Sequence, residues 1–168
     1  SLLTASGRAS QVIDPVRVDD EVVSSSIIRE AVAAGDFARA NRFLGREASF
    51  SGEVVHGDHR GRVMGFPTAN LQLEASQKIL PPNGVYACHA DTPEGSYPAI
   101  VNIGVRPTFD RSNHLLEAHL LNFTGDLYHR TIRIRVVQRI RAEKRFPDMQ
   151  ALVDQIHRDL AALQNIIP

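Results

Sequence analysis

The chain has 168 residues, enough for one ordinary domain with a small appendage but tight for two. Hydrophobic residues make up 43% and charged residues 23% of the sequence, so a disordered chain, a collagen-like chain and a coiled coil are all poor fits. Basic and acidic residues number 19 each, and this zero net charge argues against a protein that holds nucleic acid by neutralising its phosphates.

Cysteine content and hydrophobic pattern bear on the compartment. The single Cys88 has no partner for an internal disulfide, which favours a reducing environment. No apolar run approaches the roughly 18 residues that cross a bilayer, and the first ten residues lack the apolar core of a signal peptide. We therefore expect a cytoplasmic protein without a membrane partner.

The N-terminal part of the sequence predicts a tail followed by a helical hairpin. Residues 1–23 are polar and aperiodic, as in a tail or a linker. The serines at 24–26 offer N-caps for a first helix that ends at Gly35. Asp36 is placed to cap a second, short helix that Gly45 closes. The pattern predicts a helical hairpin over residues 24–45.

From residue 48 the pattern changes to short strands. Turn-forming residues separate five segments rich in β-formers, which cover 50–55, 85–90, 99–105, 115–121 and 132–137. The helices that parallel crossovers require are missing between them. We therefore expect an antiparallel sheet closed into a small barrel.

The C-terminal segment predicts one more helix. Pro147 and Asp148 supply a stop and a cap. Apolar side chains then recur at steps of four, four and three residues, at Leu152, Ile156, Leu160 and Leu163. This stripe is expected to lie against the barrel.

The densest cluster of chemically informative residues covers 56–70. It carries a glycine at every fourth position, Gly57, Gly61 and Gly65, so its backbone can turn tightly or approach a ligand. It ends in Pro-Thr-Ala-Asn at 67–70, where the Thr68 hydroxyl and the Asn70 amide oxygen point the same way in an extended chain and suit Mg²⁺ or phosphate. The alternative is a glycine-rich β-hairpin with Thr and Asn as turn formers. A Walker loop is excluded because the sequence has no Gly-Lys pair.

Glu117 interrupts an otherwise apolar run at 115–121 that only His119 also breaks. A carboxylate on so apolar a strand is expected to be partly desolvated, which raises its pKa and suits a general base. The alternative is a solvent-facing position shared with His119, with Leu116, Ala118 and Leu120 facing the core. A second open choice concerns the charged run at 139–146, which forms either a solvated face or the wall of a site with guanidinium groups and one aromatic ring.

Together these segments resemble the riboflavin kinase module of bacterial bifunctional FAD synthetases, in order over about residues 45–165. The resemblance rests on Gly-Phe-Pro-Thr-Ala-Asn at 65–70, Leu-Pro-Pro-Asn-Gly-Val-Tyr-Ala at 80–87, Asn-Ile-Gly-Val-Arg-Pro-Thr-Phe at 102–109, Leu-Glu-Ala-His-Leu-Leu at 116–121, Gly-Asp-Leu-Tyr at 125–128 and Arg-Ala-Glu-Lys-Arg-Phe at 141–146. It implies a mainly β fold, a six-stranded antiparallel Greek-key barrel with a C-terminal helix, over a kinase domain at 46–168. It also implies transfer of the γ-phosphate of ATP to the ribityl 5′-hydroxyl of riboflavin, which gives FMN and ADP.

The resemblance also assigns roles to individual residues. Thr68 and Asn70 would hold Mg²⁺ with the phosphates of ATP. Glu117 would take the proton from the ribityl hydroxyl, and Arg141 and Phe146 would help to wall the flavin site. The remaining residues of the nucleotide site would be Gly57, Arg60, Gly61, Gly65 and Pro67. This chemistry is consistent with phosphoryl transfer, which needs mainly positioning, charge neutralisation and one base.

Upstream, Ser-Ser-Ser-Ile-Ile-Arg at 24–29 resembles the stretch that closes the adenylyltransferase domain of full-length family members, with Ser26 in place of their Thr. The sequence lacks the nucleotide motif of that domain. We therefore expect the C-terminal half of a bifunctional enzyme, with residues 1–23 as a linker or remnant. This half should be monomeric, should have the adenylyltransferase domain as its partner in the same polypeptide, and should not convert FMN to FAD.

Two rival functions differ from the kinase in what they require. A flavin-binding module without turnover would not need a carboxylate such as Glu117 at the ribityl end. An oligonucleotide-binding barrel would need exposed aromatics and a basic groove. Aromatic residues make up only 6% of the chain, and Trp is missing. We therefore set the second rival aside.

Overall fold

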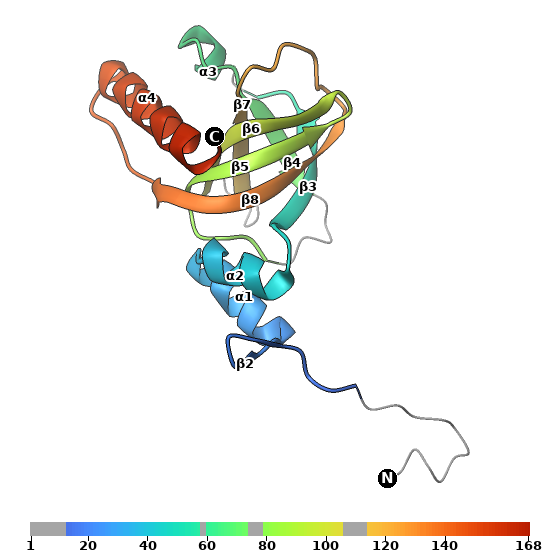
Figure 1. Ribbon diagram of the computed structural model, residues 1–168. Coiled ribbons are helices and arrows are strands. Elements are labelled where there is room, and N and C mark those ends of the chain that lie inside the picture. The colour runs from blue at the N-terminus through green and yellow to red at the C-terminus, as the bar shows by residue number, and fades with distance from the viewer. Residues whose placement is uncertain (1–12, 58–59, 74–78, 106–113) are drawn as a thin grey trace.

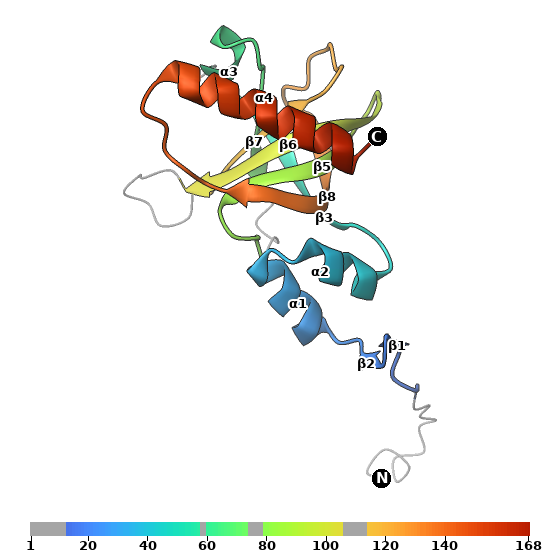
Figure 2. The ribbon, with the colours of Figure 1, turned by 60° about the vertical axis from the view of Figure 1, so that its left-hand side comes forward.

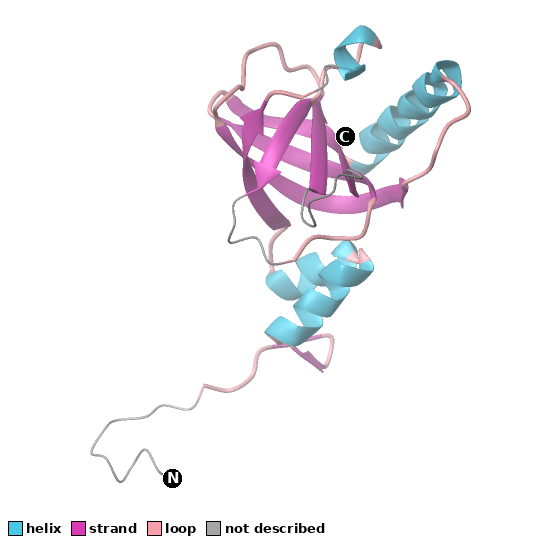
Figure 3. Cartoon of the chain, turned by 180° about the vertical axis from the view of Figure 1, so that it is seen from behind, coloured by secondary structure: helices cyan, strands magenta, loops and turns pink. Residues whose placement is uncertain are grey.

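A closed barrel of six antiparallel strands forms the centre of the protein (Figure 1). The structure is a computed structural model, and it describes residues 13–57, 60–73, 79–105 and 114–168. Around the barrel the strands follow the order β3 (Ala48–Val55), β4 (Ala69–Leu73), β7 (His114–Leu120), β6 (Gly95–Val105), β5 (Gly84–Thr92) and β8 (Thr131–Ala142). Seen from behind, the strands wrap round and the two N-terminal helices lie beneath them (Figure 3). The predicted mainly β class with a closed six-stranded barrel is confirmed.

Side-chain alternation along the strands fills the barrel interior. On β8, Ile132, Ile134 and Val136 are buried, as the alternating pattern of this segment predicts. On β7 the buried residues are Leu116, Ala118 and Leu120, so the intervening side chains face outward. Among the described residues the core is therefore largely apolar, and the polar side chains of β7 lie on the outer face of the barrel.

Strand β4 was missing from the sequence-based set of strands. It has five residues and pairs with β3 through Gly52–Leu73 to Val55–Asn70 and with β7 through Ala69–Ala118 to Leu71–Leu116. The strand is short and follows a glycine-rich segment, so the sequence shows no clear alternation of apolar and polar residues there. A tight hairpin does not join β3 to β4, because the connection contains the short helix α3 (Arg60–Val63).

The predicted helical hairpin is confirmed with its caps. Helix α1 (Ser25–Ala34) begins after Ser24, whose hydroxyl accepts a hydrogen bond from the backbone N–H of Ile27. Helix α2 (Phe37–Leu44) begins after Asp36, whose carboxylate accepts from the backbone N–H of Arg39. Both helices end at glycines in the left-handed conformation. The caps are local, which explains why the sequence alone predicts them.

The hairpin packs on one end of the barrel, at the opposite end from α3 (Figures 1 and 2). Phe37 is buried and meets Tyr86 of β5 edge to face, with ring centroids 5.7 Å apart. The Asn41 side chain donates to the carbonyl of Val136 and accepts from the backbone N–H of Ala48. Helix α2 is therefore joined to β5 by apolar packing and to β3 and β8 by hydrogen bonds.

The described part of the expected tail contains a small two-stranded hairpin. Strands β1 (Arg17–Val18) and β2 (Glu21–Val22) pair across a turn at Asp19 and Asp20, both with positive φ. Glu21 accepts from Arg39 at 2.6 Å, and Asp19 lies 3.0 Å from Arg42. These two ion pairs tie the segment to α2.

Helix α4 (Met149–Ile166) runs along the barrel beside β5, β6 and β8 (Figure 2). Asp148 caps it as predicted, by accepting from the backbone N–H of Ala151. The predicted apolar stripe is incomplete: Leu163 is buried, but Leu152, Ile156 and Leu160 are only half-buried. Gln155 and Asp159 are buried instead, because Lys144, just after β8, donates to Gln155 and Arg141 of β8 donates to Asp159. In the part of the chain that the structure describes, no helix is both long and apolar enough to cross a membrane.

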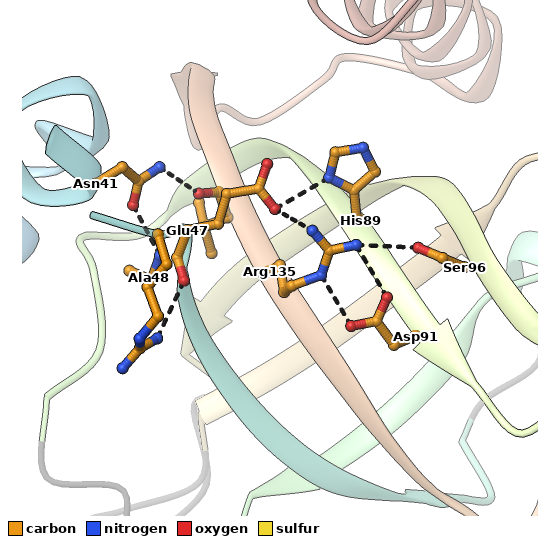
Figure 4. A network of polar contacts seen from close by, with 9 residues as sticks. Asn41, Glu47, Ala48, His89, Asp91, Ser96 and Arg135 are labelled. Carbon is orange, nitrogen blue, oxygen red and sulfur yellow. Dashed lines mark hydrogen bonds and ion pairs between the residues drawn. The ribbon is translucent and has the colours of Figure 1, made fainter. Parts of the chain in front are cut away.

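A polar network covers the outer face of the barrel where β8 meets β5 (Figure 4). Arg135 binds both carboxylate oxygens of Asp91, at 2.8 and 3.0 Å, and also donates to Ser96. The Glu47 carboxylate accepts from Arg135 and lies 3.2 Å from the His89 ring. The two-point pairing of Arg135 with Asp91 joins β8 to β5, and the Glu47 contact connects Arg135 to the residue before β3.

Asp91→Asn is expected to lower stability in a pH-dependent way. Hydrogen bonds from Arg135 hold the pKa of Asp91 below its ordinary value of 3.8. A lowered carboxyl pKa stabilises the fold above the unfolded-state pKa, and this contribution is lost as the pH falls through the folded-state value. The variant should therefore lose up to about 1 kcal/mol of unfolding free energy near neutral pH, since the pair is partly exposed. Urea unfolding from neutral pH to below 3.8 should show the difference shrinking; a constant difference would contradict the assignment.

Candidate active site

Two cavities lie on either side of strand β7 and meet at Thr68. The first, which we call the loop cavity, measures about 390 Å³ and is lined mainly by residues 67–69 and 123–128. The second, which we call the helix cavity, measures about 360 Å³ and lies between α4 and the outer face of β5, β6 and β7. Thr68 lines both cavities.

Strand β7 forms the partition between the two cavities. Ala118 and Leu120 face the barrel interior and line the loop cavity, whereas Glu117 and His119 face outward and line the helix cavity. This orientation is the one that the solvent-facing alternative for Glu117 predicts. The outer face is covered, however, so Glu117 is half-buried rather than free in solvent. Its role as a base stays a prediction.

Glu117 lies at the centre of a cross-strand row of polar residues. In the register of the sheet, Asn70 of β4 is opposite Glu117, and Glu117 is opposite Asn102 of β6. Opposite residues of an antiparallel pair project from the same face of the sheet. The row therefore aligns two amides and one carboxylate, of which Asn102 and Glu117 line the helix cavity. The sequence alone predicts no separate role for Asn102.

The Thr68 and Asn70 oxygens are suited to a hard cation. Asn70 is 8% exposed, and its Oδ1 has no hydrogen-bond partner among the described residues. A buried acceptor left unpaired costs about 1–3 kcal/mol, which a bound cation or donor would offset. Amide and hydroxyl oxygens are ligands that Mg²⁺ accepts. The residues present thus fit the magnesium ion that the resemblance implies, although Asn70 lines neither cavity directly.

Two of the three glycines in this segment, Gly57 and Gly61, leave no room for a side chain. A Cβ on Gly57 would lie 2.2 Å from Asn70 Nδ2. A Cβ on Gly61 would lie 2.4 Å from the carbonyl oxygen of Phe66 and 3.2 Å from Thr68 Oγ1. The backbone therefore passes close to the side chains of Thr68 and Asn70. The predicted approach of this segment to a ligand stays a prediction.

The glycine-rich segment forms a helical turn rather than the alternative β-hairpin. After α3, the backbone N–H groups of Met64 and Phe66 both donate to the carbonyl of Gly61. Gly65 has φ +84° and a Cβ there would meet nothing within 4 Å, so it serves the turn and lines neither cavity. Arg60 lies in α3, but its side chain falls outside the described structure, as do residues 58–59.

The loop at 121–130 contributes residues to the wall of the loop cavity, and the sequence alone predicts no role for them. Its end is fixed to β3 by two backbone hydrogen bonds, from His129 to Val54 and from Val54 to Arg130. Asp126 accepts from the backbone N–H of Tyr128, whose ring stacks on His56 at 4.0 Å. The Thr-Gly-Asp turn at 124–126 predicts only a loop, since turn chemistry carries no information about which cavity the loop lines.

Arg141 and Phe146, both predicted to wall a flavin site, line the helix cavity together with Glu117. The Arg141 guanidinium lies 5.7 Å from the centre of the Phe146 ring, and Lys144 Nζ lies 5.0 Å from it. Residues 142–145 are exposed, as a solvated face requires, whereas Arg141 and Phe146 are half-buried beside the cavity. Their part in a flavin site stays a prediction.

A buried acidic residue holds the Arg141 side chain in place. Asp159 of α4 is 3% exposed and accepts from Arg141 Nε and Nη2, the latter at 2.8 Å. Gln155 donates to the same carboxylate and accepts from Lys144 Nζ at 2.6 Å. No sequence pattern predicts this pair, because its members are 18 positions apart and only the fold brings α4 onto β8.

The chain matches the family model described as "Flavokinase: Riboflavin kinase" over residues 44–167. It is 42% identical to a bifunctional riboflavin kinase/FMN adenylyltransferase of Pseudomonas fluorescens, over 93% of this chain and 50% of that protein. Identity to the protein of the same name in Bacillus subtilis is 39%, over 88% of this chain and 48% of the relative. The chain thus spans about half the length of these curated relatives.

Two solved structures share the fold. A crystal structure named as a macrolide-efflux protein from Streptococcus pneumoniae matches with a TM-score of 0.85 and 33% identity, over 91% of this chain and 50% of that one. The riboflavin kinase of Trypanosoma brucei matches with a TM-score of 0.51 and 29% identity, over 71% of this chain and 78% of that one.

Proposed function

Because the chain belongs to the riboflavin kinase family, we propose that it transfers the γ-phosphate of ATP to the 5′-hydroxyl of riboflavin, giving FMN and ADP. The observation that carries this proposal is the pair of cavities that meet at Thr68. Direct phosphoryl transfer needs two substrates held end to end, with their reacting groups at one point and water kept out. Two cavities that share Thr68 in their walls are consistent with that arrangement.

The chemistry of the walls supports a proposal for which substrate each cavity takes. The helix cavity combines an aromatic ring, apolar side chains of α4 and a fixed guanidinium, and it suits a flat ring system with polar edges. The loop cavity, next to Pro67 and Thr68, then takes the nucleotide. A flavin-holding module without turnover would have no use for this second cavity, which favours the kinase.

Thr68 and Asn70 would hold Mg²⁺ together with the phosphates of ATP. The ion would supply positive charge to the transferring phosphoryl group and its leaving group. Gly57 and Gly61 keep the backbone close to these two side chains, which limits the space for water.

Glu117 is proposed to take the proton of the 5′-hydroxyl. As that oxygen bonds to the γ-phosphorus, the bond from phosphorus to the bridging oxygen of ADP breaks, and the carboxylate becomes a neutral carboxyl group. Glu117 lies on the face of β7 that lines the helix cavity, opposite Asn70 in the register. A positioned base of this kind contributes typically 10²–10⁴-fold to a rate.

The matched relatives are longer than this chain, which bears on the domain that accompanies the kinase. We propose that an adenylyltransferase domain accompanies it in the same polypeptide, since the matched relatives are bifunctional by name and about twice as long. The kinase half is proposed to act in the cytoplasm and as a monomer. It should make FMN but not FAD.

The test is turnover of riboflavin with ATP by the purified chain, followed by chromatography with and without Mg²⁺. We expect FMN only when ATP and the divalent cation are both present, and no FAD when FMN replaces riboflavin. Binding of riboflavin without formation of FMN would contradict the kinase and support the holding module.

A further inference from the structure

One hydrogen bond links β7 to the segment that carries Thr68. His119 Nδ1 lies 2.8 Å from the carbonyl oxygen of Pro67. A carbonyl oxygen can only accept, so Nδ1 must be the nitrogen that carries the proton in this contact. His119 therefore donates its Nδ1 proton to Pro67, and its Nε2 takes no part in this hydrogen bond.

This bond continues the strand pairing past its end. The described pairing of β4 with β7 begins at Ala69 and Ala118, and Pro67 lies two residues before Ala69. Pro67 has no N–H to offer a ladder. Backbone hydrogen bonds join β4 to β7 as far as Ala69. Beyond that point, the His119 side chain joins β7 to Pro67.

The neighbouring ring of Phe66 supports the geometry. Phe66 meets the His119 ring edge to face, with centroids 5.9 Å apart, and meets His157 of α4 in the same manner at 5.3 Å. The imidazole is therefore held between a hydrogen bond and an aromatic edge, which restricts its rotation.

We infer that His119 is a positioning residue, which acts through Nδ1 to hold Thr68 in register with Glu117. Thr68 directly follows Pro67, and Glu117 lies two residues from His119 on the same face of β7. One side chain thereby links the segment that would hold the phosphates to the strand that carries the proposed base. The inference rests on the proposed function, because it concerns the geometry of that reaction.

Two amide substitutions separate positioning from proton transfer. The side-chain nitrogen of Asn can replace Nδ1 of His, whereas that of Gln reaches the place of Nε2. We expect His119→Asn to keep kcat within a few-fold, and His119→Gln and His119→Ala to lower kcat by about 10- to 100-fold, as misplacement of a reacting group does. KM for riboflavin should change much less than kcat. His89→Asn, in the polar network away from both cavities, is the matched control and should retain full activity.

The hydrogen bond itself can be tested without activity. Long-range ¹H–¹⁵N spectra of the intact chain, recorded above the pH range where histidine ordinarily titrates, should show His119 protonated at Nδ1. Protonation at Nε2, or equal losses in the Asn and Gln variants, would overturn the inference while the kinase stands. A wild-type chain that makes no FMN would instead remove the proposed function, and the positioning role with it.

Discussion

Glu117→Gln should lower kcat for FMN formation by about two to four orders of magnitude and change KM for riboflavin only a few-fold. The amide keeps the size of the side chain and its place in the row between Asn70 and Asn102. It cannot accept the proton of the 5′-hydroxyl as a carboxylate does. The loss should therefore fall on the chemical step, measured as FMN formed at saturating ATP.

Glu94→Gln is the control for this substitution. It makes the same chemical change at an exposed position in the turn between β5 and β6, and activity should be unaffected. A Glu117→Gln enzyme within tenfold of the wild type would show that phosphoryl transfer here relies on positioning and charge alone, and would remove the assignment of a base.

Asp159→Asn should destabilise the protein by about 3 kcal/mol, at the lower end of the range for breaking a buried ion pair. The Asp159 side chain is 4% exposed and the Arg141 side chain 20% exposed, so the substitution leaves a largely desolvated guanidinium without its counter-charge. KM for riboflavin should rise as well, because Arg141 lines the helix cavity. Urea unfolding and steady-state kinetics measure the two effects.

Asp154→Asn provides the comparison on the same helix. Asp154 is exposed and contacts Gln150 of its own helix, so its loss should cost less than about 0.5 kcal/mol and leave KM for riboflavin unchanged. Equal destabilisation by the two substitutions would mean that the Arg141–Asp159 pair contributes nothing beyond helix propensity.

How much the sequence predicts depends on the range of the interactions. Ser24, Asp36 and Asp148 act on backbone groups three residues away, and all three caps were predicted correctly. Strand β4 was missed because its partners lie in β3 and β7, and its own five residues show no clear alternation. Tertiary pairing fixes such a short strand.

The same contrast between local and long-range interactions applies to the residues of the candidate site. Thr68 and Glu117 were singled out from local residue chemistry and the family resemblance, and both line the helix cavity. Asp159 carries no role predicted from the sequence, and it is buried because Arg141 reaches it from β8. His119 appeared only as a companion of Glu117, since its bond to Pro67 joins residues 52 positions apart.

The partition formed by β7 lets the two proposed substrate sites vary independently. Neighbouring positions of this strand line different cavities, so a substitution at Ala118 or Leu120 changes the wall of the loop cavity, whereas one at Glu117 or His119 changes the wall of the helix cavity. The same arrangement forbids a one-residue slip, which would turn the carboxylate into the apolar interior and expose a leucine in its place. Single substitutions in β7 can thus change one cavity at a time. An insertion or deletion within β7 would instead change the residues that line both cavities.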